Sequence, residues 1–173
     1  MVHLTKIYTK TGDKGQTSLA DNTRDNKDSP LIIAVGAIDE ANSAIGMIDG
    51  QGNQSIFNKI QNDLFDLGAD LTKSKTIKIT QKYIDDLELY IDGTNALLEP
   101  LHSFVLPTGP IHNARAIVRR AELKVWWAMA YEKEMNELIP IYLNRLSDLL
   151  FVMARYYNNG NERLWQPMGG INE

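Results

Sequence analysis

Residues 138–157, LIPIYLNRLSDLLFVMARYY, decide the fold class of this chain. Their apolar side chains recur mostly three or four positions apart, which is the repeat of one face of an α-helix. We expect a helix from about Leu138 to Tyr157 whose apolar stripe faces a core and consists of Ile141, Leu146, Leu149, Leu150 and Met153.

Four more segments, upstream of this one, have the same periodicity. A first helix is predicted after Pro30 and is stopped by Gly50–Gly52, with a stripe of Val35, Ile38, Ile45 and Ile48. A second begins near Ser55 and carries Phe57, Ile60, Leu64, Leu67 and Leu71. A third begins after Thr80, a plausible N-cap, ends by Pro100, and carries Ile84, Leu87 and Ile91. A fourth follows a loop over 101–110, with Ile111, Ala114, Val118, Ala121 and Val125.

Five helices and no convincing strand predict an all-α protein, a five-helix bundle with a four-helix up-down core plus one helix. The stretch KIYT at 6–9 could extend, but it has no partner strand in the chain. We expect a single domain over 1–173. It would comprise an N-terminal loop segment (1–30), the helical bundle (31–158) and a C-terminal tail (159–173).

The composition excludes several classes of function. Hydrophobic residues make up 43 % of the 173 residues, which is enough to bury a core. The net charge of −4 argues against a protein that binds duplex nucleic acid. The absence of cysteine removes disulfides, thiolate metal sites and cysteine nucleophiles. Because no signal peptide or membrane-spanning run is found, we expect a cytoplasmic protein with no membrane partner.

Polar residues interrupt the helical stripes at helical spacings. Arg115, Arg119 and Glu122 share one face of the fourth helix, Asn144 and Asp148 share a face of the fifth, and Asp39 and Asn42 lie on the first. They could be solvated side chains or bridges between neighbouring helices, or they could form a polar site or a subunit interface. Arg115 and Asp39 could pair between helices. Arg119 could pair with Glu122 or serve as a fork for phosphate oxygens.

The histidines and tryptophans give weaker signals. His3, His102 and His112 have no metal-site spacing, and we expect each to cap a helix or lie on the surface. Trp126 and Trp127 are adjacent and must point in different directions, so at least one is expected to pack against another helix or subunit.

The N-terminal segment is polar and rich in glycine and threonine. Its stretch TKTGDKGQTS (9–18) has Gly12 and Gly15 for close backbone approach to a ligand, and its successive N–H groups could form an anion nest. Lysines at 10, 14 and 27 and hydroxyls at 9, 11, 17 and 18 would suit a polyphosphate. The spacing is not that of a P-loop. The alternative is a flexible tail.

Six segments in order resemble the PduO-type ATP:cob(I)alamin adenosyltransferases. They are KIYTKTGDKGQTS, KDSP, AIDEANSAIG, FVLPTG, ARAIVRRAE and YLNRLSDLLFVMAR, and the likeness runs from about Lys6 to Asn158. Members of that family are homotrimeric five-helix bundles with active sites between subunits. They transfer the 5′-deoxyadenosyl group of ATP to the cobalt of reduced cobalamin and release triphosphate.

The resemblance implies roles for particular residues. The set implied to bind ATP is Thr9, Lys10, Thr11, Gly12, Thr17, Ser18, Lys27, Arg119, Arg120, Glu122 and Asn144. Lys27 and Arg119 would neutralise the leaving triphosphate together with Mg²⁺, which the ATP phosphates rather than protein ligands would hold. Phe104 would lie on the corrinoid side and block the lower axial position of cobalt. Asp39 and Arg115 would join neighbouring subunits. A reductase and an adenosylcobalamin-dependent enzyme are implied as further partners.

The chain departs from the family pattern near the expected corrinoid site. The turn PTGP (107–110) leads at once into IHNAR, so about one turn of helix is missing. The connection DGQGNQS (49–55) is also short, and Leu123 replaces a basic residue. The alternative function is therefore an ATP-binding regulatory paralogue without corrinoid chemistry. A purely structural bundle with an unoccupied tail is the third hypothesis.

Overall fold

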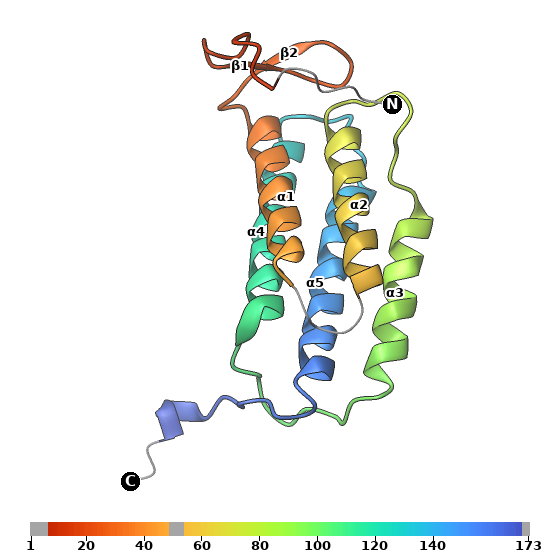
Figure 1. Cartoon of the computed structure of the whole chain (residues 1–173), viewed down its shortest axis with the longest axis vertical. Helices are drawn as coiled ribbons and strands as arrows, with labels where there is room; N and C mark the ends of the chain where they lie inside the picture. The colour runs from red at the N-terminus through yellow and green to blue at the C-terminus, as the bar shows by residue number, and fades with distance from the viewer. Residues whose placement is uncertain (1–6, 49–53, 171–173) are drawn as a thin grey trace.

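Five α-helices run alternately up and down in a bundle (Figure 1). The computed structural model describes residues 7–48 and 54–170. Its helices are α1 (Pro30–Gly46), α2 (Gln54–Leu71), α3 (Gln81–Asn95), α4 (Gly109–Met129), α5 (Leu138–Tyr157) and a short 3₁₀ helix, η1 (Pro167–Gly170). α1 packs against α2 and α4, and α5 packs against α4 and α3. The predicted all-α, five-helix bundle is confirmed.

The predicted apolar stripes line the core, except that Val35 of α1 and Ile91 of α3 are only partly buried against it and Ile141 of α5 is exposed. All five stripe residues of α2 and all five of α4 are buried. On α5, Leu146, Leu149, Leu150 and Met153 are buried, whereas Ile141 is exposed and its prediction was wrong. Ile141 lies five residues before Leu146, which turns it about 140° away from the stripe on a helix of 3.6 residues per turn. The neighbouring Tyr142 is fully buried instead.

Local signals set where the helices begin. The Ser29 hydroxyl accepts a hydrogen bond from the Ile32 N–H at 3.3 Å, and Pro30 occupies the first turn of α1. Thr80 is the N-cap of α3, as predicted, but its side chain makes no capping hydrogen bond. The predicted stop at Gly50–Gly52 lies outside the described residues, as does most of the short connection at 49–55.

A small antiparallel hairpin sits above the helices (Figure 1), so the prediction that the chain has no convincing strand was wrong. Strand β1 (Gln16–Ser18) pairs with β2 (Arg24–Asn26), with Thr17 opposite Asp25. Strands of three polar residues carry no periodic signal. The Ala20 N–H donates to the Thr72 carbonyl at 2.9 Å, which fastens the hairpin to the end of α2.

The C-terminal tail leaves the bundle at the end opposite the hairpin (Figure 1). Before it does so, Leu164 forms an isolated antiparallel bridge with Val105 in the loop that precedes α4. None of the helices within residues 7–48 and 54–170 is long and apolar enough to cross a membrane.

Candidate functional site

The N-terminal loop folds back on itself between the described start of the chain and β1. The Gly15 N–H donates to the Gly12 carbonyl at 3.1 Å, and the Lys27 N–H donates to the Gly15 carbonyl at 2.8 Å. Gly15 has a φ of 82°, which favours glycine because the residue has no Cβ. Lys10 also has a positive φ, of 61°. The loop is therefore an ordered turn, which argues against a flexible tail.

Lys27 reaches across this turn from the segment that leads into α1. A Cβ on Gly12 would lie 3.1 Å from Lys27 Nζ and 3.1 Å from the Gln16 carbonyl oxygen. A guanidinium N–H of Arg24 donates to the Thr11 carbonyl at 2.8 Å and ties the loop to β2. The structure thus brings the predicted phosphate-binding residues of the loop and Lys27 into one place.

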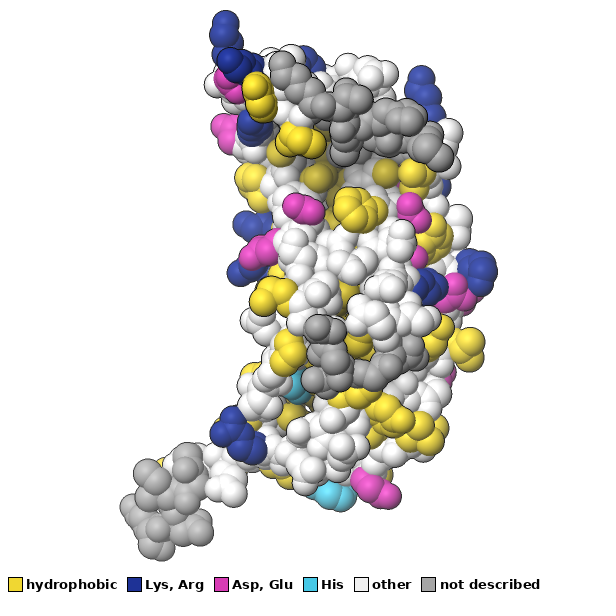
Figure 2. All heavy atoms as spheres, viewed as in Figure 1, with side chains coloured by type: hydrophobic (Ala, Val, Ile, Leu, Met, Phe, Trp, Pro, Cys, Tyr) yellow, Lys and Arg dark blue, Asp and Glu magenta, His cyan; other side chains and the backbone are white. Residues whose placement is uncertain are grey.

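Hydroxyl and basic groups of this segment remain accessible. The hydroxyls of Thr9 and Thr11 lie 2.9 Å apart, and both residues are exposed. Lys10, Lys14 and Lys27 are exposed as well. Figure 2 shows Lys and Arg side chains gathered at the hairpin end of the molecule. This arrangement can donate several hydrogen bonds to one anionic ligand and neutralise part of its charge.

The basic face of α4 lies further down the bundle. Arg120 forms an ion pair with Glu40 of α1. Glu122 accepts a long hydrogen bond of 3.4 Å from the Trp126 indole N–H. Arg119 is exposed, and within residues 7–48 and 54–170 it makes no ion pair with Glu122. The structural interpretation of Arg119 as a partner of Glu122 therefore has no support in the fold, and its guanidinium remains available for a ligand.

Arg115 lies on α4 one turn before Arg119 and is half-buried. Its Nε atom is buried and has no hydrogen-bond partner within the described part of the chain. Burial, together with the charge of Arg119, lowers the pKa of the Arg115 guanidinium. Asp39, on α1, is exposed and forms no ion pair with Arg115 in this chain. The predicted pairing of these two residues does not form between helices of one chain.

The remaining predicted polar residues are divided among several helices. Asn144 is half-buried, and its side-chain oxygen accepts from Arg145 Nη1 at 3.0 Å. Asn42 is buried and donates to the Gln61 carbonyl, whereas Asp148 is exposed. Trp126 and Trp127 both remain exposed on α4, so in this chain neither is buried against another helix.

His112 corrects a prediction. It is buried at 5 % exposure and packs edge-on against Phe151, with ring centroids 5.9 Å apart, so it is not a surface or capping residue. Burial, and secondarily the charge of Arg115, lower the pKa of His112. The sequence misled because a histidine at the start of a helix is usually exposed to solvent, whereas this one packs against Phe151 of α5, 39 positions further along the chain.

Phe104 lies in the loop before α4, at the end of the bundle far from the hairpin. It is 77 % exposed and contacts Trp165 edge-to-face, with centroids 6.1 Å apart. An aromatic residue so exposed contributes little to the core, so simple core packing does not explain Phe104. The contact with Trp165 could not be predicted from the sequence, because it joins residues about sixty positions apart.

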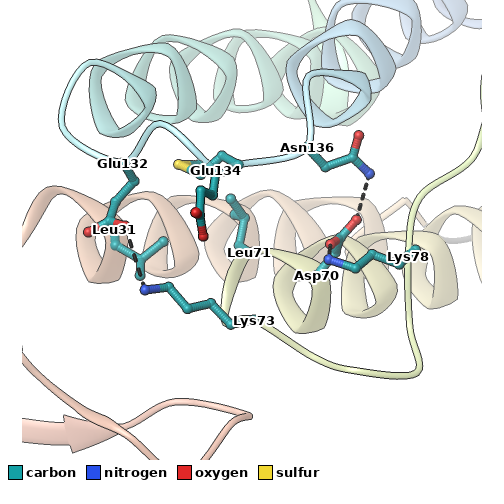
Figure 3. Close-up of a pocket in the computed structure, with 9 residues that line it drawn as sticks. Leu31, Asp70, Leu71, Lys73, Lys78, Glu132, Glu134 and Asn136 are labelled. Atoms are coloured by element: carbon teal, nitrogen blue, oxygen red, sulfur yellow. Dashed lines mark hydrogen bonds and ion pairs between the residues drawn. The ribbon is translucent and has the colours of Figure 1, made fainter.

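A charged pocket lies where α2 ends, beneath the loop between α4 and α5 (Figure 3). The buried side chain of Asp70 lies in the middle of this pocket's lining. The carboxylate accepts from the Ile79 N–H at 2.8 Å and from Asn136 Nδ2 at 2.7 Å, and it pairs with Lys78 at 3.0 Å. Nearby, Lys73 pairs with Glu132 at 3.6 Å. Asp70 and Lys78 are paired with each other, as are Lys73 and Glu132, so this pocket fixes the connections at the hairpin end and is not the site predicted from sequence.

The predicted residues therefore form three groups in order along α4. The loop with Lys27 lies at the hairpin end, the arginine face lies midway, and Phe104 lies beyond the start of the helix. Arg119 is ten residues into α4, which corresponds to about 15 Å at 1.5 Å per residue. No group of three or more His, Cys, Asp or Glu side chains within residues 7–48 and 54–170 is arranged to hold a metal ion.

Comparisons with known proteins identify the family of this chain. The sequence model of the cobalamin adenosyltransferase family matches residues 7–157. A corrinoid adenosyltransferase of Mycobacterium tuberculosis is 45 % identical over 186 residues, covering 97 % of this chain and 96 % of that protein. One from Bacillus subtilis is 43 % identical over 169 residues, covering 88 % of this chain and 86 % of that protein.

The fold is also similar to a solved structure of a variant PduO-type ATP:corrinoid adenosyltransferase from Lactobacillus reuteri complexed with cobalamin and ATP. The TM-score is 0.85 at 34 % identity, covering 93 % of this chain and 99 % of that one. The chain belongs to the cobalamin adenosyltransferase family. The predictions of the family and of an adenosyltransferase enzyme are confirmed.

Proposed function

We propose that this protein transfers the 5′-deoxyadenosyl group of ATP to the cobalt of cob(I)alamin, at a site between subunits. The two electrons of Co(I) attack the C5′ carbon, the bond from C5′ to the triphosphate oxygen breaks, and adenosylcobalamin and triphosphate form. An external reductant has to supply the Co(I) state. The observation that carries the proposal is the order of the three residue groups along α4, together with the family match.

That order matches the order of the reacting parts. The turn at 10–15 and Lys27 would hold the triphosphate, Arg119 would lie near the middle, and Phe104 would lie under the corrinoid. The nucleophile is cobalt itself, so no serine, cysteine or histidine nucleophile is required. The task left to the protein is to position the two substrates and stabilise the charge that builds on the leaving group.

The cationic side chains suit that task. Lys27 is exposed beside the Gly12 turn, and the Arg119 guanidinium is exposed on α4. Both would become more effective once the ligand excludes water, because charge interactions strengthen at low dielectric constant. Mg²⁺ would be held by triphosphate oxygens. Lys10, Thr9, Thr11, Thr17 and Ser18 would donate further hydrogen bonds to ATP, and Arg120, Glu122 and Asn144 would complete its site.

Phe104 would act on the corrinoid side without supplying a ligand. A bare aromatic ring beneath cobalt keeps the lower axial position empty, which makes the metal easier to reduce. The 77 % exposure of its side chain leaves the ring free for such a contact.

A homotrimer is part of the proposal. The buried Arg115 Nε, which has no partner among residues 7–48 and 54–170, would be satisfied by Asp39 of a neighbouring copy. A groove of about 500 Å³ between α1 and α2, lined by Asp39, Val35 and the exposed Phe65, offers a surface for that copy. We place the enzyme in the cytoplasm, where ATP is available.

Anaerobic turnover tests the proposal. Cob(I)alamin, prepared by chemical reduction, is mixed with MgATP and protein, and the loss of its absorption band and the formation of adenosylcobalamin are followed. We expect turnover with the wild-type protein and a loss of about 100-fold or more in kcat/KM for Arg119→Ala, since this residue contacts developing charge. ATP binding without any turnover would instead identify a regulatory paralogue. No ATP binding would leave only a structural bundle.

A further inference from the structure

The tail after α5 pairs with the loop that carries Phe104. The Trp165 N–H donates to the Phe104 carbonyl at 2.7 Å, and the Leu106 N–H donates to the Arg163 carbonyl at 2.7 Å. The Ser103 hydroxyl adds a third hydrogen bond, to the Trp165 carbonyl at 2.8 Å. Two segments about sixty residues apart are therefore joined as a short antiparallel ladder, which we call the loop–tail clamp (103–106 with 163–165).

The clamp brings two aromatic rings together on the surface. The rings of Phe104 and Trp165 meet edge-to-face at an interplanar angle of 62°. Phe104 is 77 % exposed and Trp165 is 47 % exposed. An exposed phenyl ring with few neighbours can change rotamer freely, and fixing it costs conformational entropy. The indole of Trp165 restricts the Phe104 ring before any ligand arrives.

A buried ion pair anchors the tail at its base. Arg155, near the end of α5, pairs with Glu162 at 2.9 Å, and each side chain is only 8 % exposed. Arg155 also donates to the Glu99 carbonyl at 2.7 Å. A buried pair of this kind is sensitive to geometry, because removing one partner leaves a buried charge without compensation. The tail up to Trp165 is therefore held in place.

The clamp also borders a cavity. A space of about 230 Å³ is lined by Val105 of the loop, Glu162 of the tail, and His112 and the first turn of α4. The loop and the tail thus form two walls of one recess at the corrinoid end. A change in the tail would alter the position of the loop without touching the N-terminal turn.

We infer that Trp165 is a positioning residue of the corrinoid site, acting through the loop–tail clamp to hold the Phe104 ring under the corrinoid. The inference rests on the proposed function. Trp165 forms no bond to cobalt and takes no part in the transfer of the adenosyl group. It sets where the Phe104 ring lies, and through that ring it favours the corrinoid state without a lower axial ligand.

The test compares Trp165→Ala, Trp165→Phe and Met168→Ala with wild type. Met168 is a matched control in the same tail, since it is 89 % exposed and lies beyond the clamp. The variants are mixed anaerobically with cob(II)alamin and MgATP. Electron paramagnetic resonance then gives the fraction of cobalt that has lost its lower ligand. Calorimetry gives the Kd for ATP, and turnover with cob(I)alamin gives kcat and KM.

We call the fraction of cobalt that has lost its lower axial ligand the four-coordinate fraction. For Trp165→Ala we expect this fraction to fall about threefold or more and kcat to fall about tenfold. The Kd for ATP should stay within about twofold of the wild-type value. Trp165→Phe should recover at least half of that fraction, because a smaller aromatic ring still contacts Phe104. Met168→Ala should match wild type.

Three results would overturn the inference. The first is a four-coordinate fraction in Trp165→Ala equal to that of the wild-type protein. The second is a four-coordinate fraction that falls as far in Met168→Ala as in Trp165→Ala. The third is a loss of ATP binding in Trp165→Ala alongside the loss of the four-coordinate fraction, which would indicate a general effect on the fold. A wild-type protein that forms no adenosylcobalamin would overturn the proposed function as well. The two failures are therefore distinguishable within one experiment.

Discussion

The Lys27 ammonium lies beside the α-carbon of Gly12, so close that a methyl group on Gly12 would come within 3.1 Å of Nζ. The same methyl group would lie 3.1 Å from the Gln16 carbonyl, whose residue is fixed in β1. A lysine side chain can move away, but a strand carbonyl yields less easily. The missing side chain at Gly12 is therefore what allows Lys27 to lie over the turn.

This relationship predicts the effect of Gly12→Ala. The new methyl group should displace the Lys27 ammonium or widen the turn, and the Kd for ATP should rise about tenfold, equivalent to about 1.4 kcal/mol. Calorimetric titration with MgATP measures it. Gly93→Ala is the control, because nothing lies within 4 Å of a Cβ at that position in α3. It should leave ATP affinity unchanged and add up to about 1 kcal/mol of stability. Equal affinities of Gly12→Ala and wild type would refute this role of Gly12.

Asp70 predicts a stability effect at the same end of the bundle. Its side chain is 1 % exposed and accepts from Ile79 and Asn136 while pairing with Lys78. Asp70→Asn removes the negative charge and turns one acceptor into a donor that faces Lys78. We expect the free energy of unfolding to fall by about 1–3 kcal/mol, as measured by urea denaturation. The exposed Asp92→Asn on α3 serves as the control. A loss below about 0.5 kcal/mol would contradict the account.

The sequence predicted the helices well because their apolar stripes and their core coincide. It failed where structure depends on contacts between distant residues or on very short elements. The three-residue strands show no alternation of apolar and polar residues that would predict them. Ile141 was assigned to the apolar stripe of α5 although its position about the helix axis lies away from that stripe. Ser29 and Pro30 form a recognisable start signal, because a capping residue is followed by proline before an apolar run. This pattern alone predicts that α1 starts at Pro30.

The candidate site was predictable only in part, because contacts between residues far apart in the sequence leave no local pattern. The N-terminal turn is local, so its glycines and lysines could be recognised from spacing. The contacts of Glu40 with Arg120 and of Trp165 with Phe104 join distant parts of the chain, so sequence spacing does not predict them. The contact of Arg24 with the Thr11 carbonyl stays within the N-terminal segment, but it has no periodic signal either. The proposed role of Phe104 came from resemblance alone. Resemblance also favoured phosphate binding over pairing with Glu122 for Arg119, and the structure adds that the side chains of Arg119 and Phe104 are both exposed.

His112 predicts a pH dependence of stability. Burial and the charge of Arg115 lower its pKa in the folded protein, partly offset by Glu162. As pH falls below about 6.5, the unfolded chain therefore binds a proton that the folded chain resists. The stability contribution of neutral His112 is present above that pH and is lost as the pH falls. Urea unfolding between pH 8 and pH 5 should show a shallower decline for His112→Phe than for wild type. Parallel curves would refute the prediction.

The last prediction concerns Arg115 and Asp39. The Nε of Arg115 is buried without a partner in the described part of the chain, and Asp39 is exposed on the neighbouring helix. If a second copy supplies the carboxylate, Asp39→Ala should leave a partly buried charge uncompensated at the interface, which typically costs several kcal/mol. Light scattering should then report a smaller species than wild type. Asp85→Ala, an exposed change on α3, should leave the mass unchanged. The charge swap Asp39→Arg with Arg115→Asp should restore the larger assembly, because it rebuilds the same pair with its ends exchanged. A wild-type protein that is already a stable monomer, or an Asp39→Ala variant of unchanged mass, would show that Arg115 finds its partner elsewhere.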